Sequence, residues 1–216
     1  AVTTGDKNTG VGYNALTALT TGSWNTAVGY EAGKDMTTGA DNTAIGLGSG
    51  WAITTGSRNI AIGGVSLDAA DAENDNLAIG YAALGGAING GEMNVAIGNY
   101  SLDANTTGDN NTAVGYNALT ANTTGAYNVG LGTYALALNT TGVSNLAIGH
   151  VALAENTTGN YNVGVGQSTL NGNTTGLRNT ALGYGALDFP DTENDNLAIG
   201  YDALGGSIAG GEYNIA

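Results

Sequence analysis

The sequence predicts an all-β fold, a parallel β-solenoid in which each repeat of 17 residues forms one coil. Three observations lead to this expectation. An Asn followed by a short apolar stretch and Gly returns along the whole chain at an almost constant spacing. Hydrophobic residues make up 42% of the chain and fall at regular intervals, which separates it from a disordered Gly-rich segment. The repeat is also too short, and too rich in Gly and Thr-Thr, to hold a pair of helices.

The anchor Asn is taken as position 1 of each repeat. Stacking of the coils would place the anchors in one column, where each side-chain amide bonds the Asn above and below it. About 13 coils at a spacing of about 4.8 Å would form a rod roughly 60 Å long. The anchors are Asn8, Asn25, Asn42, Asn59, Asn76, Asn94, Asn111, Asn128, Asn145, Asn162, Asn179, Asn196 and Asn214.

Within a repeat, positions 2 to 6 alternate in the manner of a β-strand. Gly at position 5, and Gly at the end of the Thr-Thr-Gly at positions 13–15, mark the expected corners, where a positive φ is cheap for Gly alone. We expect the aliphatic residue at position 4 and the Leu at position 9 to fill a thin interior. Position 3 is always Ala or Gly. That face is expected to meet either a second strand inside the coil or the same face of another chain.

The repeats continue from one end of the sequence to the other, so residues 1–216 are expected to form one continuous domain. Two repeats are one residue longer, which predicts 18-residue coils at 76–93 and 196–213. The segment that starts at Asp75 returns 120 residues later at Asp195 with few changes. This longer period indicates the duplication of a unit of seven coils.

The predicted interior is thin, because each coil offers only two or three aliphatic side chains. A narrow rod buries little apolar area. Association of chains along the Ala/Gly face would remedy this, and we expect a homotrimer wound about a common axis.

The segments Asn76–Gly80, Asn94–Gly98 and Asn145–Gly149 share the form Asn-x-Ala-Ile-Gly. This form resembles the head repeat of trimeric autotransporter adhesins of the Hep/Hag type. The longer phrase at 111–125 is similar to repeats in tail-fibre-like proteins of phages and bacteria. The resemblance covers the whole chain and implies a left-handed parallel β-roll, homotrimeric, in a surface or virion fibre. The family's repeat is shorter, and Thr-Thr-Gly is the apparent insertion here.

Charge and composition argue against several functions. Four basic residues against 18 acidic ones give a formal net charge of −14, which excludes a nucleic-acid partner and disfavours an anionic membrane surface. The sequence holds no apolar run long enough to insert in a bilayer. Without Cys, and with His150 as its only His, it offers neither a metal cluster nor a nucleophile–base pair. We therefore expect no enzyme and no cofactor.

An acidic block replaces Thr-Thr-Gly before each long coil. One interpretation is a calcium site built from Asp71 and Glu73, and from Asp191 and Glu193 in the second copy, since hard oxygen ligands are crowded there. The favoured interpretation is a solvated turn.

Arginine would balance the charge of this turn. Stacking of the coils predicts the ion pairs Arg58–Asp75 and Arg178–Asp195, with Asp41 on the other side of Arg58. Such surface pairs are worth little energetically, but they can hold the register of the coils.

The polar turn leaves two further interpretations open. Asn-Thr-Thr is a formal glycosylation sequon and is also ordinary turn chemistry before Gly. Stacked Thr pairs raise an ice-binding alternative, which is less favoured because adjacent residues of a strand point to opposite sides. The sequons start at Asn105, Asn122, Asn139, Asn156 and Asn173.

Aromatic residues form two partial columns. One is at position 6, in six coils, and the other comes just before the anchor, at Trp24, Tyr127, Tyr161 and Tyr213. We expect packing between coils or chains, with carbohydrate stacking as the functional alternative.

These observations predict a structural repeat segment of an extracellular fibre on a cell surface or a virion. It would give reach, stiffness and adhesion, with surface glycans or a host receptor as partners. The alternative is the subunit of a self-assembling extracellular filament.

Overall fold

The structure is a computed structural model that describes residues 4–190, 192–206 and 210–216. Its described part is all-β and contains twelve short strands, with no helix and hence no helix that could cross a membrane. The strands are β1 (Thr9–Val11), β2 (Thr26–Val28), β3 (Thr43–Ile45), β4 (Ile60–Ile62), β5 (Leu77–Ile79), β6 (Val95–Ile97), β7 (Thr112–Val114), β8 (Val129–Leu131), β9 (Leu146–Ile148), β10 (Val163–Val165), β11 (Thr180–Leu182) and β12 (Leu197–Ile199).

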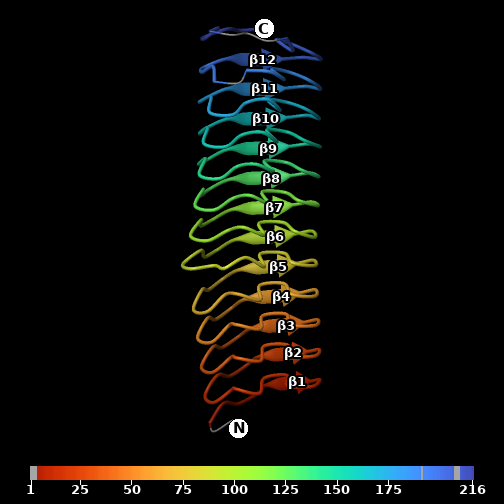
Figure 1. Cartoon of the computed structure of the whole chain (residues 1–216), viewed down its shortest axis with the longest axis vertical. Coiled ribbons are helices and arrows are strands. Elements are labelled where there is room, and N and C mark those ends of the chain that lie inside the picture. The colour runs from red at the N-terminus through yellow and green to blue at the C-terminus, as the bar shows by residue number, and fades with distance from the viewer. Residues whose placement is uncertain (1–3, 191, 207–209) are drawn as a thin grey trace.

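All twelve strands form one parallel sheet in the order of the sequence, and Figure 1 shows them stacked one above another along the molecule. The register shift between neighbouring strands is 17 residues, as in the pairing of Thr112 with Val129. It is 18 only between β5 and β6, where Leu77 pairs with Val95, and at the isolated bridge from Leu197 to Ile215. The chain is thus a parallel β-solenoid with one coil per repeat. Its twelve strands span eleven turns, about 53 Å, because the thirteenth repeat contributes only that bridge.

Hydrogen bonds between coils continue around the coil beyond the strands. On the wall opposite the sheet, Leu119 N donates to the carbonyl of Ala135 at 3.0 Å. In the polar turn, Thr123 N donates to the carbonyl of Thr140 at 2.9 Å. Because backbone groups pair with the next coil at most positions of the repeat, the coils are held together all the way round.

The corners of the coil differ from the expectation. Gly at position 5 has a positive φ throughout, for example +138° at Gly115, but Gly at position 15 of the 17-residue coils does not. Position 15 needs Gly because a Cβ there would overlap the carbonyl of the next coil, as at Gly125 against Gly142. The other left-handed corners, at positions 7, 9 and 17, are occupied mostly by residues other than Gly, such as Tyr127 with φ +59°. Close stacking rather than backbone handedness therefore selects Gly at position 15.

The interior is assembled differently from the sequence-based expectation. Ala at position 3 of the strand points inward and is buried, whereas the aliphatic side chain at position 4 points outward. At Gly130, which occupies position 3 of β8, an added Cβ would already lie 3.5 Å from the Leu119 side chain. The opposite wall thus leaves room for a methyl group only. The prediction that position 4 fills the core was wrong, and of the two roles considered for position 3 the one inside the coil is correct.

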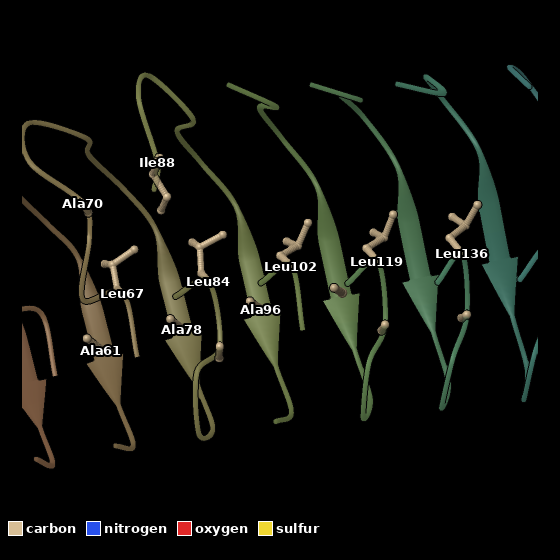
Figure 2. Close-up of a cluster of buried hydrophobic side chains, with 14 of the residues drawn as sticks. Ala61, Leu67, Ala70, Ala78, Leu84, Ile88, Ala96, Leu102, Leu119 and Leu136 are labelled. Atoms are coloured by element: carbon tan, nitrogen blue, oxygen red, sulfur yellow. The ribbon is translucent and has the colours of Figure 1, made fainter. Parts of the chain in front are cut away.

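Leu at position 9 is the commonest of the large, fully buried side chains. Figure 2 shows Leu67, Leu84, Leu102, Leu119 and Leu136 stacked in one column, with Ala side chains of the strands nearby. Position 12 is the second interior column. It is apolar in the first five coils and Asn in the next five; in the 18-residue coil the equivalent residue, Ile88, is the thirteenth. Its members are Leu19, Met36, Ile53, Ala70, Ile88, Asn105, Asn122, Asn139, Asn156 and Asn173.

Candidate functional site

One candidate surface runs the length of the sheet: its outer face, formed by the side chains at positions 2 and 4 of β1–β12. This face exists because each strand turns its small residue, Ala or Gly at position 3, inward and its larger side chains outward. None of its side chains is charged, and Ile148, Leu182 and Ile199 are 36%, 48% and 57% exposed. Scattered exposed aliphatics are ordinary, whereas a continuous apolar stripe along a whole molecule marks an interaction surface.

A column of tyrosines at positions 6 and 7 follows one edge of this face. At its two ends the rings are stacked, with centroids 5.2 Å apart for Tyr13 and Tyr30 and 5.3 Å for Tyr184 and Tyr201. In the middle, four rings meet edge to face at 5.6–6.0 Å, namely Tyr81, Tyr100, Tyr116 and Tyr134. The rings therefore pack mainly on one another along the axis, as expected for packing between coils.

The corner column, at position 17, lies at the opposite edge of the outer face. Arg58 Nε donates to Asp75 at 2.6 Å, and Arg178 Nε donates to Asp195 at 2.6 Å, so the structure brings both predicted ion pairs together. Each contact is bidentate, because Nη2 also donates to the second carboxylate oxygen. The adjacent arginine holds the pKa of each aspartate below its ordinary value.

Asp41 makes no ion pair with Arg58 among the described residues, and it acts on the guanidinium only through its charge. Farther along the corner column, the Nζ atom of Lys7 lies 3.8 Å from the ring centroid of Trp24, which is a cation–π contact.

In the acidic block, a glutamate side chain binds backbone N–H groups. The carboxylate of Glu73 is buried and accepts hydrogen bonds from the N–H groups of Asp71, Ala72 and Gly90 at 2.8–3.1 Å. These bonds connect the block to the long coil that follows it. Both carboxylate oxygens thus already have backbone donors, an arrangement that leaves Glu73 little capacity to coordinate calcium.

The second copy of the block has the same arrangement at Glu193, which accepts from the N–H groups of Thr192 and Gly210. Asp191 lies outside the described residues. In the part of the chain that the structure describes, no group of three acidic or imidazole side chains could hold a metal ion.

The anchor asparagines form the expected column, but with a different bonding pattern. The Oδ1 atom of Asn111 accepts the backbone N–H of Asn128 at 3.0 Å, and its side-chain N–H reaches across the coil to the carbonyl of Gly125 at 2.8 Å. The direct amide–amide contacts are longer, 3.3 Å for Asn128 Nδ2 to Asn111 Oδ1. Each anchor therefore joins two coils and closes its own coil.

A second asparagine ladder was not anticipated. The sequon asparagines at position 12 are fully buried, and their amides bond directly from coil to coil at 2.7–2.9 Å. Each also donates to the carbonyl of the Gly at position 15, as Asn122 does to Gly125. Leu, Met or Ile replaces Asn at this position in other repeats, and that exchange was the sequence signal of an interior site.

The threonines before Gly have two different environments. The hydroxyl at position 13 is held by the next coil, as for Thr123 Oγ1, which donates to the carbonyl of Thr140 at 2.9 Å. Only the Thr at position 14 is exposed, for example Thr124. The exposed hydroxyls thus form a single file, whereas ice binding was considered for a flat ladder of paired threonines.

Side chains suited to catalysis do not converge within the described residues. His150 is exposed and stands alone among the tyrosine column positions. Asp188 is the one described residue with a buried, unpartnered side-chain oxygen, and burial, with help from Asp202 and Glu155, raises its pKa. No pocket is found in the described part of the rod. The surfaces available for recognition are therefore open ones.

No family model matches this chain, and no curated protein or solved structure matches it either.

Proposed function

We propose that this chain is a structural repeat segment of an extracellular or virion fibre, a left-handed β-roll in which three copies pack along the outer face of the sheet. The chain supplies reach and stiffness, and it presents its other sides to surface glycans or a host receptor. The proposal extends the resemblance to trimeric adhesin heads and tail-fibre repeats.

The single observation that carries it is the uncharged stripe over the full length of the sheet, aliphatic at position 4 of every strand and aliphatic or Thr at position 2, between the tyrosine column and the corner column. A face of this kind costs free energy in water, and it has the same repeat in every copy of the chain. Copies can therefore pack with their coils in register, which buries apolar area that the thin interior cannot supply.

Light scattering on the purified chain tests this proposal. We expect a mass three times the 21.3 kDa of one chain. Ile148→Glu, on the outer face, should lower the mass to that of one chain, because three buried carboxylates would meet near the axis. Thr158→Glu adds the same charge to the polar wall of the same coil and should leave the mass unchanged.

A stable monomer in the unmodified chain would overturn the trimer. Electron microscopy separates the remaining alternative: discrete short rods support the trimeric segment, and continuous fibres support the self-assembling filament.

A further inference from the structure

Most aromatic rings on the rod already have a partner. The tyrosine column packs on itself, and lysines lie over Trp24 and Trp51. Tyr127 and Tyr161, in the corner column, are different. Each is 61% exposed, and neither has a ring or cation contact among the described residues. Their ring faces are therefore available to a ligand.

The two rings are mounted in the same way. Both residues have φ of +59°, and the N–H of each donates to the carbonyl of the preceding coil, at 3.0 Å to Asp109 and 3.1 Å to Val143. They are two coils apart, about 9.6 Å along the axis. Ser144, with φ of +57°, stands between them and is held in the same way by Ala126. The rings are thus rigidly spaced, with only a small hydroxyl-bearing side chain in the gap.

Polar groups continue this line in both directions. Asn110 occupies the corner before Tyr127, and Arg178 occupies the corner after Tyr161, with its guanidinium oriented by Asp195. The corner column thus alternates polar side chains with exposed rings over four coil steps, about 19 Å. Such a platform offers apolar faces and hydrogen-bonding groups in turn along a straight line.

A chain of pyranose sugars has the complementary chemistry. Its rings present C–H faces that stack on aromatic rings, and its hydroxyls reach donors and acceptors between them. An extended β-1,4-linked chain turns the same ring face toward one side at every second sugar, which suits two rings separated by a polar gap. The net charge of −14 repels acidic glycans. The open surface also suits the side of a long chain rather than its end.

We propose that the corner from Asn110 to Arg178 binds a neutral β-1,4-linked glycan along the rod axis, with Tyr127 and Tyr161 as its stacking platforms. This inference rests on the proposed function, since it names the partner of the fibre, but its residues lie outside the outer face of the sheet.

Titration calorimetry with cellohexaose and chitohexaose tests the site. We expect at least one of them to bind, and Tyr127→Ala or Tyr161→Ala to weaken that binding by about tenfold. Tyr127→Phe keeps the ring and should bind as the unmodified chain does. Tyr116→Ala removes a tyrosine of the other column, whose ring is engaged by Tyr100 and Tyr134, and should leave binding unchanged.

The site is overturned if neither oligosaccharide binds, if Tyr116→Ala weakens binding as much as Tyr127→Ala, or if a heparin oligosaccharide binds as well as the neutral probes. The mass by light scattering of the same samples keeps the two proposals separate. A trimer without glycan binding removes only this site, and a monomer that binds the glycan removes only the trimer.

Discussion

At the scale of the residue, one side chain in each coil performs three tasks. The anchor asparagine accepts the N–H of the next anchor, donates across its own coil to the carbonyl at position 15, and fills the corner between the two walls. Asp would lack the donor, and Ser would be too short to span the coil. These requirements explain why the residue at position 1 never varies in the sequence.

The middle of this column allows a direct test. Replacing Asn128 with Ala leaves the N–H of Asn145 without its partner and removes one of the two donors to the buried carbonyl of Gly142, which keeps the bond from Asn139. We expect a loss of roughly 2–4 kcal/mol in the free energy of unfolding, measured by chemical denaturation. Asn8→Ala, in the part-buried first coil, is the matched control with a smaller loss. Equal losses at the two sites would contradict the role of burial.

Ionisation of Asp188 should lower the stability of the fold as the pH rises, whereas most carboxylates in folded proteins have the opposite effect. Burial raises its pKa above the ordinary 3.8, so the folded chain holds the proton more firmly than the unfolded chain. Its charge therefore destabilises the fold at neutral pH, and this penalty disappears as the pH falls through the raised pKa. Asp188→Asn should raise the free energy of unfolding at neutral pH, and this gain should shrink as the pH falls and vanish in acid below the ordinary pKa of an aspartate. Asn171 shows that Asn fits the equivalent place in the preceding coil.

Asp195 is the control of opposite sign for this experiment. Its hydrogen bond with Arg178 lowers its pKa, so the stability that it contributes is present at neutral pH and is lost as the pH falls. Asp195→Asn should therefore reduce stability at neutral pH and have little effect in acid. Denaturation curves of both variants at the two pH values check the pair, and a gain for Asp195→Asn at neutral pH would contradict the assignment.

At the scale of the element, the side chains at positions 9 and 12 compete in most coils for the same interior space. Where position 12 is Met36 or Ile53, position 9 is Gly, and an added Cβ at Gly50 would lie 3.0 Å from Ile53. Where position 9 is Leu, position 12 is in most coils the smaller Asn or Ala. Most coils therefore hold one long side chain on this wall, at either position, whereas the coils of Leu16 and Leu19 and of Leu84 and Ile88 hold two.

This exchange predicts strong coupling between Leu102 and Asn105. Leu102→Gly alone should cost about 3–5 kcal/mol through lost burial, and Asn105→Met alone about 1–3 kcal/mol through overpacking and the loss of its hydrogen bonds with Asn122 and Gly108. The double variant copies the pattern of Gly33 and Met36, and Gly suits the φ of +52° at Leu102. We expect its cost to be at least about 1 kcal/mol below the sum, in a double-mutant cycle by denaturation. If the cost of the double variant equalled the sum of the two single costs, the two side chains would not compete for the same space.

The sequence predicted the coil, its period and its register, because a repeat of 17 residues forces identical positions to stack. It did not predict which face of the strand points inward. Alternation marks two faces without naming them, and the aliphatic residue at position 4 was assigned to the core on hydrophobicity alone. The wall at positions 9 and 12 leaves space for the methyl of Ala113 but not for Val114. The burial of Asn at position 12 was missed for the same reason: the sequence alone did not show that this residue faces the interior.

At the scale of the whole molecule, the ladders should hold the rod together without a bound metal ion. The long coils, which carry the acidic block, are the places where a cation could matter, yet backbone N–H groups already occupy the carboxylate of Glu73. We expect the same melting temperature with calcium and with a chelator. Glu73→Gln should melt lower in both, because its amide would face three donors. A rise in melting temperature with calcium would restore the calcium interpretation.

The buried sequons have a consequence for making the protein. In a secretory pathway that glycosylates Asn-x-Thr, the sugar is transferred to a chain that has not yet folded. A glycan on Asn139 could not enter a ladder in which that amide is fully buried between Asn122 and Asn156. Each occupied sequon would block the closure of its coil. Production in a host without this modification avoids the conflict. In a host that has it, the fraction of the five sites that carries a glycan would report how long these coils remain unfolded.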